Sequence, residues 1–264
     1  MTHFFKISAV IILTVVSVVS CKSTDDEGAA MDLKAENRKS LGASSEDILS
    51  ADNYSKLRIE FLFSETTKPT IESKLLIQDF VYDRANKPGG VHIIETLIPA
   101  PTNETFSLDD IREIEDEYRT QYTEEDDIAV SVYFANGHSE NDTETSVTLG
   151  SAYQNTSIVV YSDTLQEFIN GTGDVSLADL EVLTTTHEFG HLFGLVNISD
   201  DDIHTEGHED TEHSKHCVVE DCLMYYASSA TRAAIKTRFE NRGVESIPEL
   251  DALCLADLVA KGGK

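Results

Sequence analysis

Positive charge is scarce in this sequence. Its 20 lysine and arginine residues are outnumbered by 48 aspartate and glutamate residues, which gives a formal net charge of −28 at pH 7. Phosphate backbones and anionic membrane surfaces repel a chain with that balance. We therefore expect no nucleic-acid partner and no attachment to lipid by charge alone.

A long hydrophobic run is also missing at the N-terminus. The mostly apolar stretch from Ile7 to Val19 covers thirteen residues, whereas a helix that crosses a bilayer needs roughly 20. Lys6 precedes this stretch, and Ser20 and Cys21 follow it. That layout is typical of a secretory signal peptide and not of a membrane-spanning helix.

The residues VVSC, 18 to 21, resemble the lipobox of bacterial lipoproteins. The resemblance implies a signal peptide over 1–20 and a lipid anchor on Cys21, which would become the mature N-terminus. An ordinary signal peptide with an incidental cysteine is the alternative. The acidic stretch after Cys21 is similar to the surface-export signal of Bacteroidetes lipoproteins. It implies an outer-membrane lipoprotein of the cell envelope, exposed at the surface.

Composition divides the rest of the chain into two parts. Residues 21–53 are polar and acidic, so we expect a disordered tether. Residues 54–264 are enough for one domain with a substantial core, and no internal repeat is visible. Periodicity predicts strands at 56–63, 89–98 and 128–137, two short strands within 149–161, and helices at 71–85, 107–122, 176–194 and 248–260. This order indicates an α+β class, or mixed α/β, with a mixed sheet.

The stretch HEFGHLFG, 187 to 194, carries the chemistry. His187 and His191 are four residues apart, so on a helix both imidazoles lie on one face and can bind one metal ion. Catalytic zinc takes three protein ligands and leaves a fourth position for water. Glu188 is placed to act as the general base that takes a proton from this water.

This motif resembles that of the metzincin zinc peptidases, which continues through the glycine to a third histidine. Asn197 stands at that continuation. The residues CLMYY, 222 to 226, are similar to the methionine turn of the family. In matrix metalloproteinases and archaemetzincins the third histidine lies eight residues before the methionine, and eight residues before Met224 is His216. HCVVEDCLM, 216 to 224, also resembles the archaemetzincin signature, so the resemblance implies that His216 is the third ligand.

An insertion then separates the ligands. Between Gly194 and His216 lie 21 residues where the family has two, which makes an insertion of 19. A loop of this length costs little additional closure entropy. Its histidines, His204, His208 and His213, are rival ligands, of which His213 is the strongest, and a solvated acidic loop is the alternative. A calcium or second zinc site built from His208, Asp210 and His213 is a further alternative.

The cysteines allow two interpretations. Archaemetzincins carry a second, structural zinc on four cysteines, and here Asp257 stands where the fourth would be, after Cys254. The resemblance therefore implies a site of Cys217, Cys222, Cys254 and Asp257. In an exported protein two of the cysteines could instead form a disulfide, which the compartment favours slightly.

Tyr226 lies two residues after Met224, as in astacins and serralysins, where the tyrosine reaches the metal or the oxyanion. It is a candidate catalytic residue by resemblance, and a packed core tyrosine is the equal alternative. Met224 itself is expected to form a hydrophobic base under the site.

The sequence thus predicts a monomeric zinc endopeptidase that acts on peptides or proteins. The resemblance implies the metzincin fold, with a twisted mixed sheet, a backing helix, an active-site helix and a small C-terminal subdomain. It also implies that extended substrates pair with an edge strand near residues 149 to 153. A non-catalytic metal-binding lipoprotein and an inactive protease homologue are the alternatives, and the presence of Glu188 argues against the first. No propeptide with a cysteine switch is visible.

Overall fold

The computed structural model describes residues 32, 34–172, 175–198, 202–204, 207–226 and 247–264. They belong to one compact unit, Asp32–Lys264. The predicted signal peptide, Cys21 and the first part of the predicted tether lie outside the described residues. Within the described part, no helix is both long and apolar enough to cross a membrane.

A five-stranded sheet organises the unit, in the order β2-β1-β4-β7-β6. Four strands run parallel, and β6 pairs antiparallel with β7 at one edge. The strands are β1 (Lys56–Phe63), β2 (Val91–Leu97), β4 (Asp127–Ala135), β6 (Gly150–Gln154) and β7 (Ser157–Tyr161). The structure is therefore a mixed α/β fold with a mostly parallel sheet, and the predicted edge strand near 149 to 153 is β6.

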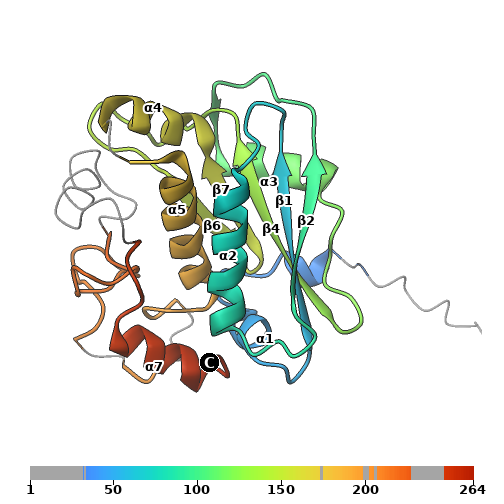
Figure 1. The fold of residues 1–264 in the computed structure, drawn as a ribbon, viewed down its shortest axis with the longest axis vertical. Coiled ribbons are helices and arrows are strands. Elements are labelled where there is room, and N and C mark those ends of the chain that lie inside the picture. The colour runs from blue at the N-terminus through green and yellow to red at the C-terminus, as the bar shows by residue number, and fades with distance from the viewer. Residues whose placement is uncertain (1–31, 33, 173–174, 199–201, 205–206, 227–246) are drawn as a thin grey trace, which may run out of the picture. The chain divides into compact units, whose positions relative to one another are not determined.

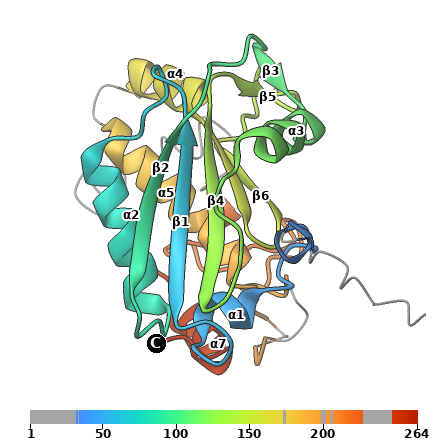
Figure 2. The same ribbon diagram turned by 90° about the vertical axis from the view of Figure 1, so that its right-hand side faces the viewer.

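Helices cover both faces of this sheet. Figures 1 and 2 show α2 (Ile71–Arg84) and α5 (Leu177–Leu192) on one face and α3 (Leu108–Tyr118) on the other. Alternate strand residues feed the two hydrophobic cores: Val130 and Val132 of β4 pack with the first, and Tyr133 with the second. This alternation follows from the two-residue period of a strand.

Polar side chains cap the first turns of several helices. The hydroxyl of Ser107 accepts from the Asp110 N–H at the start of α3, and Ser176 and Asp179 form the same capping box at the start of α5. α7 (Ala252–Ala260) begins at the cap residue Asp251, a few residues later than the sequence suggests. α4 (Ser162–Thr172) and the two-stranded sheet of β3 (Thr105–Phe106) and β5 (His138–Ser139) were not predicted.

The N-terminal segment departs from the predicted disordered tether over 21–53. Residues 34–50 fold onto the unit and contain η1 (Ala35–Asn37) and α1 (Ser45–Leu49). Ile48 and Leu49 are buried in the first core, and the buried Asn37 side chain donates to the Ala129 carbonyl oxygen at 2.9 Å. Burial and these hydrogen bonds offset the entropy of ordering a polar segment, so the folded unit begins before residue 54.

Candidate active site and metal centres

Helix α5 supplies the first two imidazoles. Each of its residues from Leu180 to Leu192 is buried, because α5 packs between the sheet, α2 and the C-terminal segment. His187 and His191 follow each other on one face, and their ring centroids lie 4.9 Å apart at 88°. The exposed fraction is 0% for His187 and 8% for His191.

His216 completes the group, although it is 25 positions beyond His191 in the chain. Its ring centroid lies 5.3 Å from that of His187 and 5.3 Å from that of His191. One nitrogen from each of the three rings lies within 4.8 Å of the others. The structure therefore brings together the three histidines that the sequence names as ligands.

The protonation of two rings suits metal binding. His187 Nδ1 lies 2.8 Å from the Leu223 carbonyl oxygen, and His216 Nδ1 lies 3.0 Å from that of Ser214. A carbonyl oxygen only accepts, so each Nδ1 carries the proton and each Nε2 keeps its lone pair. Burial holds the pKa of His191 well below its usual value, and lowers that of His216. The neutral imidazole is the form that binds a metal.

Met224 lies directly beneath α5. A Cβ added at Gly190, between the two helix histidines, would lie 2.2 Å from Met224 Sδ. Glycine is therefore needed at this position for the thioether to reach the helix. The turn also brings the Leu223 carbonyl to His187, so the segment orients a candidate ligand as well as filling space.

Glu188 lies beside the three imidazoles and against the edge strand. Its Oε2 accepts from the Ala152 N–H of β6 at 2.7 Å. Burial raises the pKa of Glu188 to about 7, and the hydrogen bond from Ala152 opposes this shift. The close approach depends on Gly150, because a Cβ there would lie 2.6 Å from Thr184 Cγ2. A pocket of about 300 Å³ opens here and is lined by Glu188, His191 and His216 among others.

Asn197 closes the neck of the insertion. It adopts a φ of 58° just after Gly194, whose φ of 74° ends the helix. The Asn197 N–H donates to Asp202 at 2.7 Å, its side-chain amide donates to Glu209 at 3.1 Å, and its carbonyl oxygen accepts from the Lys215 ammonium. Asn197 thus links the two ends of the insertion that precedes His216.

His213 is not part of the imidazole group. Its ring stacks on that of Tyr226, with centroids 3.6 Å apart and planes at 5°. Its Nδ1 lies 2.8 Å from Asp210 Oδ2. The alternative calcium or zinc site is not assembled, since His208 lies elsewhere. The candidate catalytic residue Tyr226 is partly buried, with one face of its ring against the insertion.

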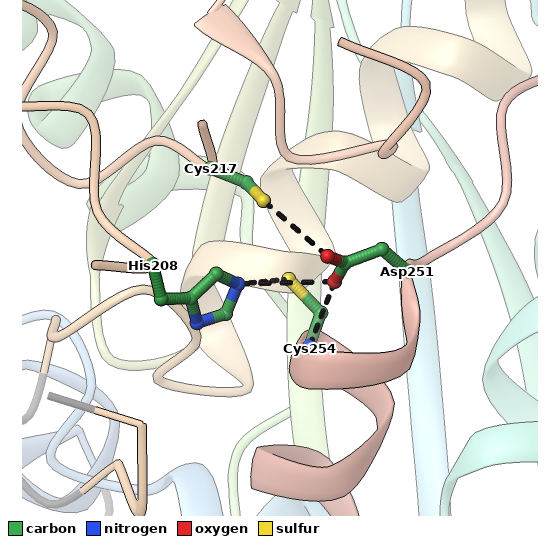
Figure 3. A group of neighbouring side chains, drawn as sticks. All are labelled: His208, Cys217, Asp251 and Cys254. Carbon is green, nitrogen blue, oxygen red and sulfur yellow. Dashed lines mark hydrogen bonds and ion pairs between the residues drawn. The ribbon is translucent and has the colours of Figure 1, made fainter. Parts of the chain in front are cut away.

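Figure 3 shows a second cluster of side chains that could bind a metal ion, made of His208, Cys217, Asp251 and Cys254. Atoms of His208, Cys217, Asp251 and Cys254 lie within 4.8 Å of one another. The His208 Nε2 to Cys254 Sγ distance is 3.3 Å, and Cys222 Sγ lies 3.6 Å from Cys254 Sγ. A tetrahedral zinc ion with bonds of about 2.3 Å to sulfur separates two sulfurs by about 3.8 Å. These two spacings suit one ion, and the group of atoms that all lie within 4.8 Å of one another includes Asp251 but not Cys222.

Backbone N–H groups point at these sulfurs. Val219 N–H donates to Cys217 Sγ, and the N–H groups of Met224 and Asp251 donate to Cys222 Sγ, each at 3.4 Å. Hydrogen bonds from the Cys217 and Cys254 thiols and from this backbone hold the pKa of Cys222 far below its usual value, while the hydrogen bonds among the thiols raise the pKa of Cys217 and Cys254. Without a metal the contacts therefore stabilise one thiolate, Cys222, which is the form that binds metal.

The structure corrects the expected fourth ligand of this cluster. Asp257 is buried but faces the histidines of the insertion: its Oδ2 lies 3.3 Å from His208 Nδ1, and its Oδ1 accepts from His204 N–H at 3.1 Å. His208 lies beside the cysteines, at the place that the resemblance implied for Asp257. Nothing in the spacing distinguished His208 from its neighbours. The favoured disulfide is also not formed, since Cys217, Cys222 and Cys254 are joined by none.

Comparisons with known proteins add a distant likeness. No protein-family model matches the chain, and no curated protein does either. Among solved structures, one crystal structure from Methanopyrus kandleri shares 13% identity, covers 78% of this chain and 96% of that chain, and has a TM-score of 0.48. That neighbour is an archaemetzincin. With so low a score, the function of this chain has to be argued from its own residues.

Proposed function

We propose that this protein is a zinc-dependent endopeptidase whose metal is held by His187, His191 and His216. The observation that carries the proposal is the convergence of three buried imidazoles beside a buried carboxylate and an open pocket. Two of the rings have their Nδ1 atoms engaged by carbonyl oxygens, so the donor set fits zinc. A pure metal-binding protein has no need of Glu188 at this position.

Bound zinc would supply the Lewis acid that activates a water molecule and polarises the peptide carbonyl. Glu188 takes the proton of that water and passes it to the leaving amine. A raised pKa suits this role, because a base that also donates works best with a pKa near the ambient pH. Edge strand β6 presents main-chain groups next to Glu188, where an extended peptide can pair with it.

The test is the variant Glu188→Gln, with zinc content and peptide hydrolysis measured on the same sample. We expect one zinc ion to remain on the histidines while hydrolysis falls by several orders of magnitude. Tyr226→Phe is measured alongside it, because this change removes the hydroxyl group and keeps the ring stacked on that of His213. If Glu188→Gln hydrolysed peptides at the parental rate, the mechanism would be wrong and the metal-binding lipoprotein would be favoured.

We propose in addition that a second, structural zinc ion binds His208, Cys217, Cys222 and Cys254. Asp251 is the competing ligand, but its Oδ1 already accepts from the Cys254 N–H as the cap of α7, at 2.8 Å. Zinc also favours thiolate over carboxylate in structural sites. We expect about two zinc ions per chain, and three free thiols among Cys217, Cys222 and Cys254 on titration of the unfolded, metal-free protein. One thiol instead of three would support the disulfide.

The lipid anchor remains a proposal as well, because Cys21 lies outside the described residues. The change Cys21→Ser should move the protein from the membrane fraction to the soluble one, since the acyl chains would supply the membrane affinity. A mature N-terminus that does not begin at Cys21 would contradict an outer-membrane lipoprotein.

A further inference from the structure

The N-terminal strap, residues 34–50, reaches the candidate active site. Leu41 in this strap lines the same pocket as Glu188 and His216. This contact could not be predicted, because Leu41 lies within the predicted tether and far from the zinc motif. A segment outside the metal centre therefore forms part of the surface that a substrate meets.

The strap is held in place on both sides of Leu41. On one side, Lys39 N–H donates to Asn155 Oδ1 at 3.0 Å, and Asn155 N–H donates to the Lys39 carbonyl oxygen at 3.1 Å. On the other side, Asn155 Nδ2 donates to Ser44 Oγ at 2.8 Å. Asn155 is fully buried in the turn between β6 and β7. The strap is thus fixed to the strand that borders the pocket.

A tight turn presents Leu41. The Ala43 N–H donates to the Ser40 carbonyl oxygen at 3.1 Å, which makes Leu41 the second residue of a β-turn. Gly42, the third residue, has a φ of 82°, which a glycine adopts without strain at this place in a type II turn. Leu41 is only half-buried, although it packs against the first core, so part of its side chain stays available to a ligand.

We propose that Leu41 forms an apolar wall of the substrate cleft and contacts the substrate side chain next to the scissile bond. The inference rests on the proposed peptidase function and adds a specificity determinant to it. Leu41 lines the pocket together with residues of β6. Outside α5 and β6, Ile198 is the other aliphatic side chain that lines it. An extended peptide on β6 directs alternate side chains to one side. The protein then prefers peptides with an apolar residue at that position.

Paired charge variants test the wall. The hydrolysis of three peptides by Leu41→Glu and by Leu41→Lys is compared with that by the parent. The peptides differ only at one position beside the cleaved bond, which carries leucine, lysine or glutamate. The comparison is repeated for each position next to that bond. At one position we expect the parent to prefer leucine, Leu41→Glu to shift towards lysine and Leu41→Lys towards glutamate. The ratio of kcat/KM for lysine and glutamate peptides should differ at least about tenfold between the two variants, mainly through KM.

Leu97 provides the matched control. It is an exposed leucine of β2, at the opposite edge of the sheet, so Leu97→Glu and Leu97→Lys change charge equally without touching the pocket. These variants should keep the parental ranking. Zinc content and melting temperature are measured for all four, because a folded protein with its metal is required for the comparison. If both Leu41 variants keep the parental ranking within twofold, the wall is refuted.

A binding experiment separates this inference from the peptidase proposal. The same peptides are titrated into zinc-loaded Glu188→Gln protein with Leu41 intact, changed to glutamate or changed to lysine. Binding that follows the charge at position 41 supports the wall even if the parent hydrolyses nothing, in which case only the peptidase function fails. If the parent hydrolyses peptides but binding does not depend on the residue at position 41, only the wall is refuted. If the parent hydrolyses no peptide and the Glu188→Gln proteins bind none, the wall and the peptidase function are both refuted.

Discussion

The residues of the two candidate metal clusters alternate along the chain, yet the clusters differ in chemistry and in access. The first consists of imidazoles only and opens into a pocket beside Glu188. The second is rich in sulfur, and its cysteines and His208 are buried. Open sites with three protein ligands serve catalysis, whereas closed sites with four serve structure. Because His216 and Cys217 are neighbours, one short segment serves both clusters.

The largest effect should come from His216→Ala. Two imidazoles on one helix leave the tetrahedron short of a ligand, so zinc binding at the first cluster should weaken sharply and hydrolysis should disappear. Metal analysis and peptide cleavage are the measurements, and the second cluster should keep its ion. His213→Ala is the control and should remain active. If His213→Ala lost zinc and activity while His216→Ala kept both, His213 and not His216 would be the third ligand.

Removing a thiol from the second cluster should cost stability first. We expect Cys254→Ser to lower the free energy of unfolding by at least about 4 kcal/mol, the range in which the loss of a structural metal lies. Denaturant unfolding with and without chelator checks this, since the chelator should lower the free energy of unfolding of the parent to that of the variant. Val259→Ser, on the exposed side of the same helix, should change little. If Cys254→Ser is less stable than the parent by the same amount in the presence of chelator, the loss comes from packing alone.

Asp257→Asn should have a smaller effect. Asp257 orients His208 without belonging to the proposed ligands, and partners of that kind are worth about 10–100-fold in metal affinity. Competition with a chromogenic chelator should show this loss at the second cluster, with hydrolysis retained. Asp210→Asn, which removes the partner of His213, is the matched control. Complete loss of the second ion would instead favour Asp257 as a ligand.

The smallest effect is expected at the neck of the insertion. Asn197→Gly removes the side-chain bond to Glu209 but tolerates the positive φ, so we expect a loss of about 1 kcal/mol. Asn197→Ala adds the strain of a left-handed conformation, about 1 kcal/mol more. Both should retain full zinc, which thermal unfolding and metal analysis would show. Loss of zinc in either would make Asn197 part of the first cluster.

The sequence anticipated the elements whose signals are local. The helix predicted at 176–194 is α5, and the strand predicted at 128–137 is β4. The position of His216 came from the resemblance to the metzincin methionine turn, in which the third histidine precedes the methionine by eight residues. These features depend on neighbours in the chain, which is why they could be predicted.

Other features depend on the path of the chain through space. His204, His208 and His213 are equivalent in one dimension, and only the course of the insertion decides that His208 reaches the cysteines. The strap looked like a tether because it has few apolar residues. Its order comes from hydrogen bonds to Asn155, more than a hundred positions away, and no local pattern announces such a partner.

The insertion has a consequence for how this chain can vary. Asn197 and Lys215 bring its two ends together, so shortening the loop between them should leave His216 in place. If His208 binds the second ion, however, a deletion that reaches it removes a ligand that Asp257 does not replace from its present position. The insertion would then be obligatory for the second cluster, and homologous chains with a shorter insertion should carry a different fourth ligand.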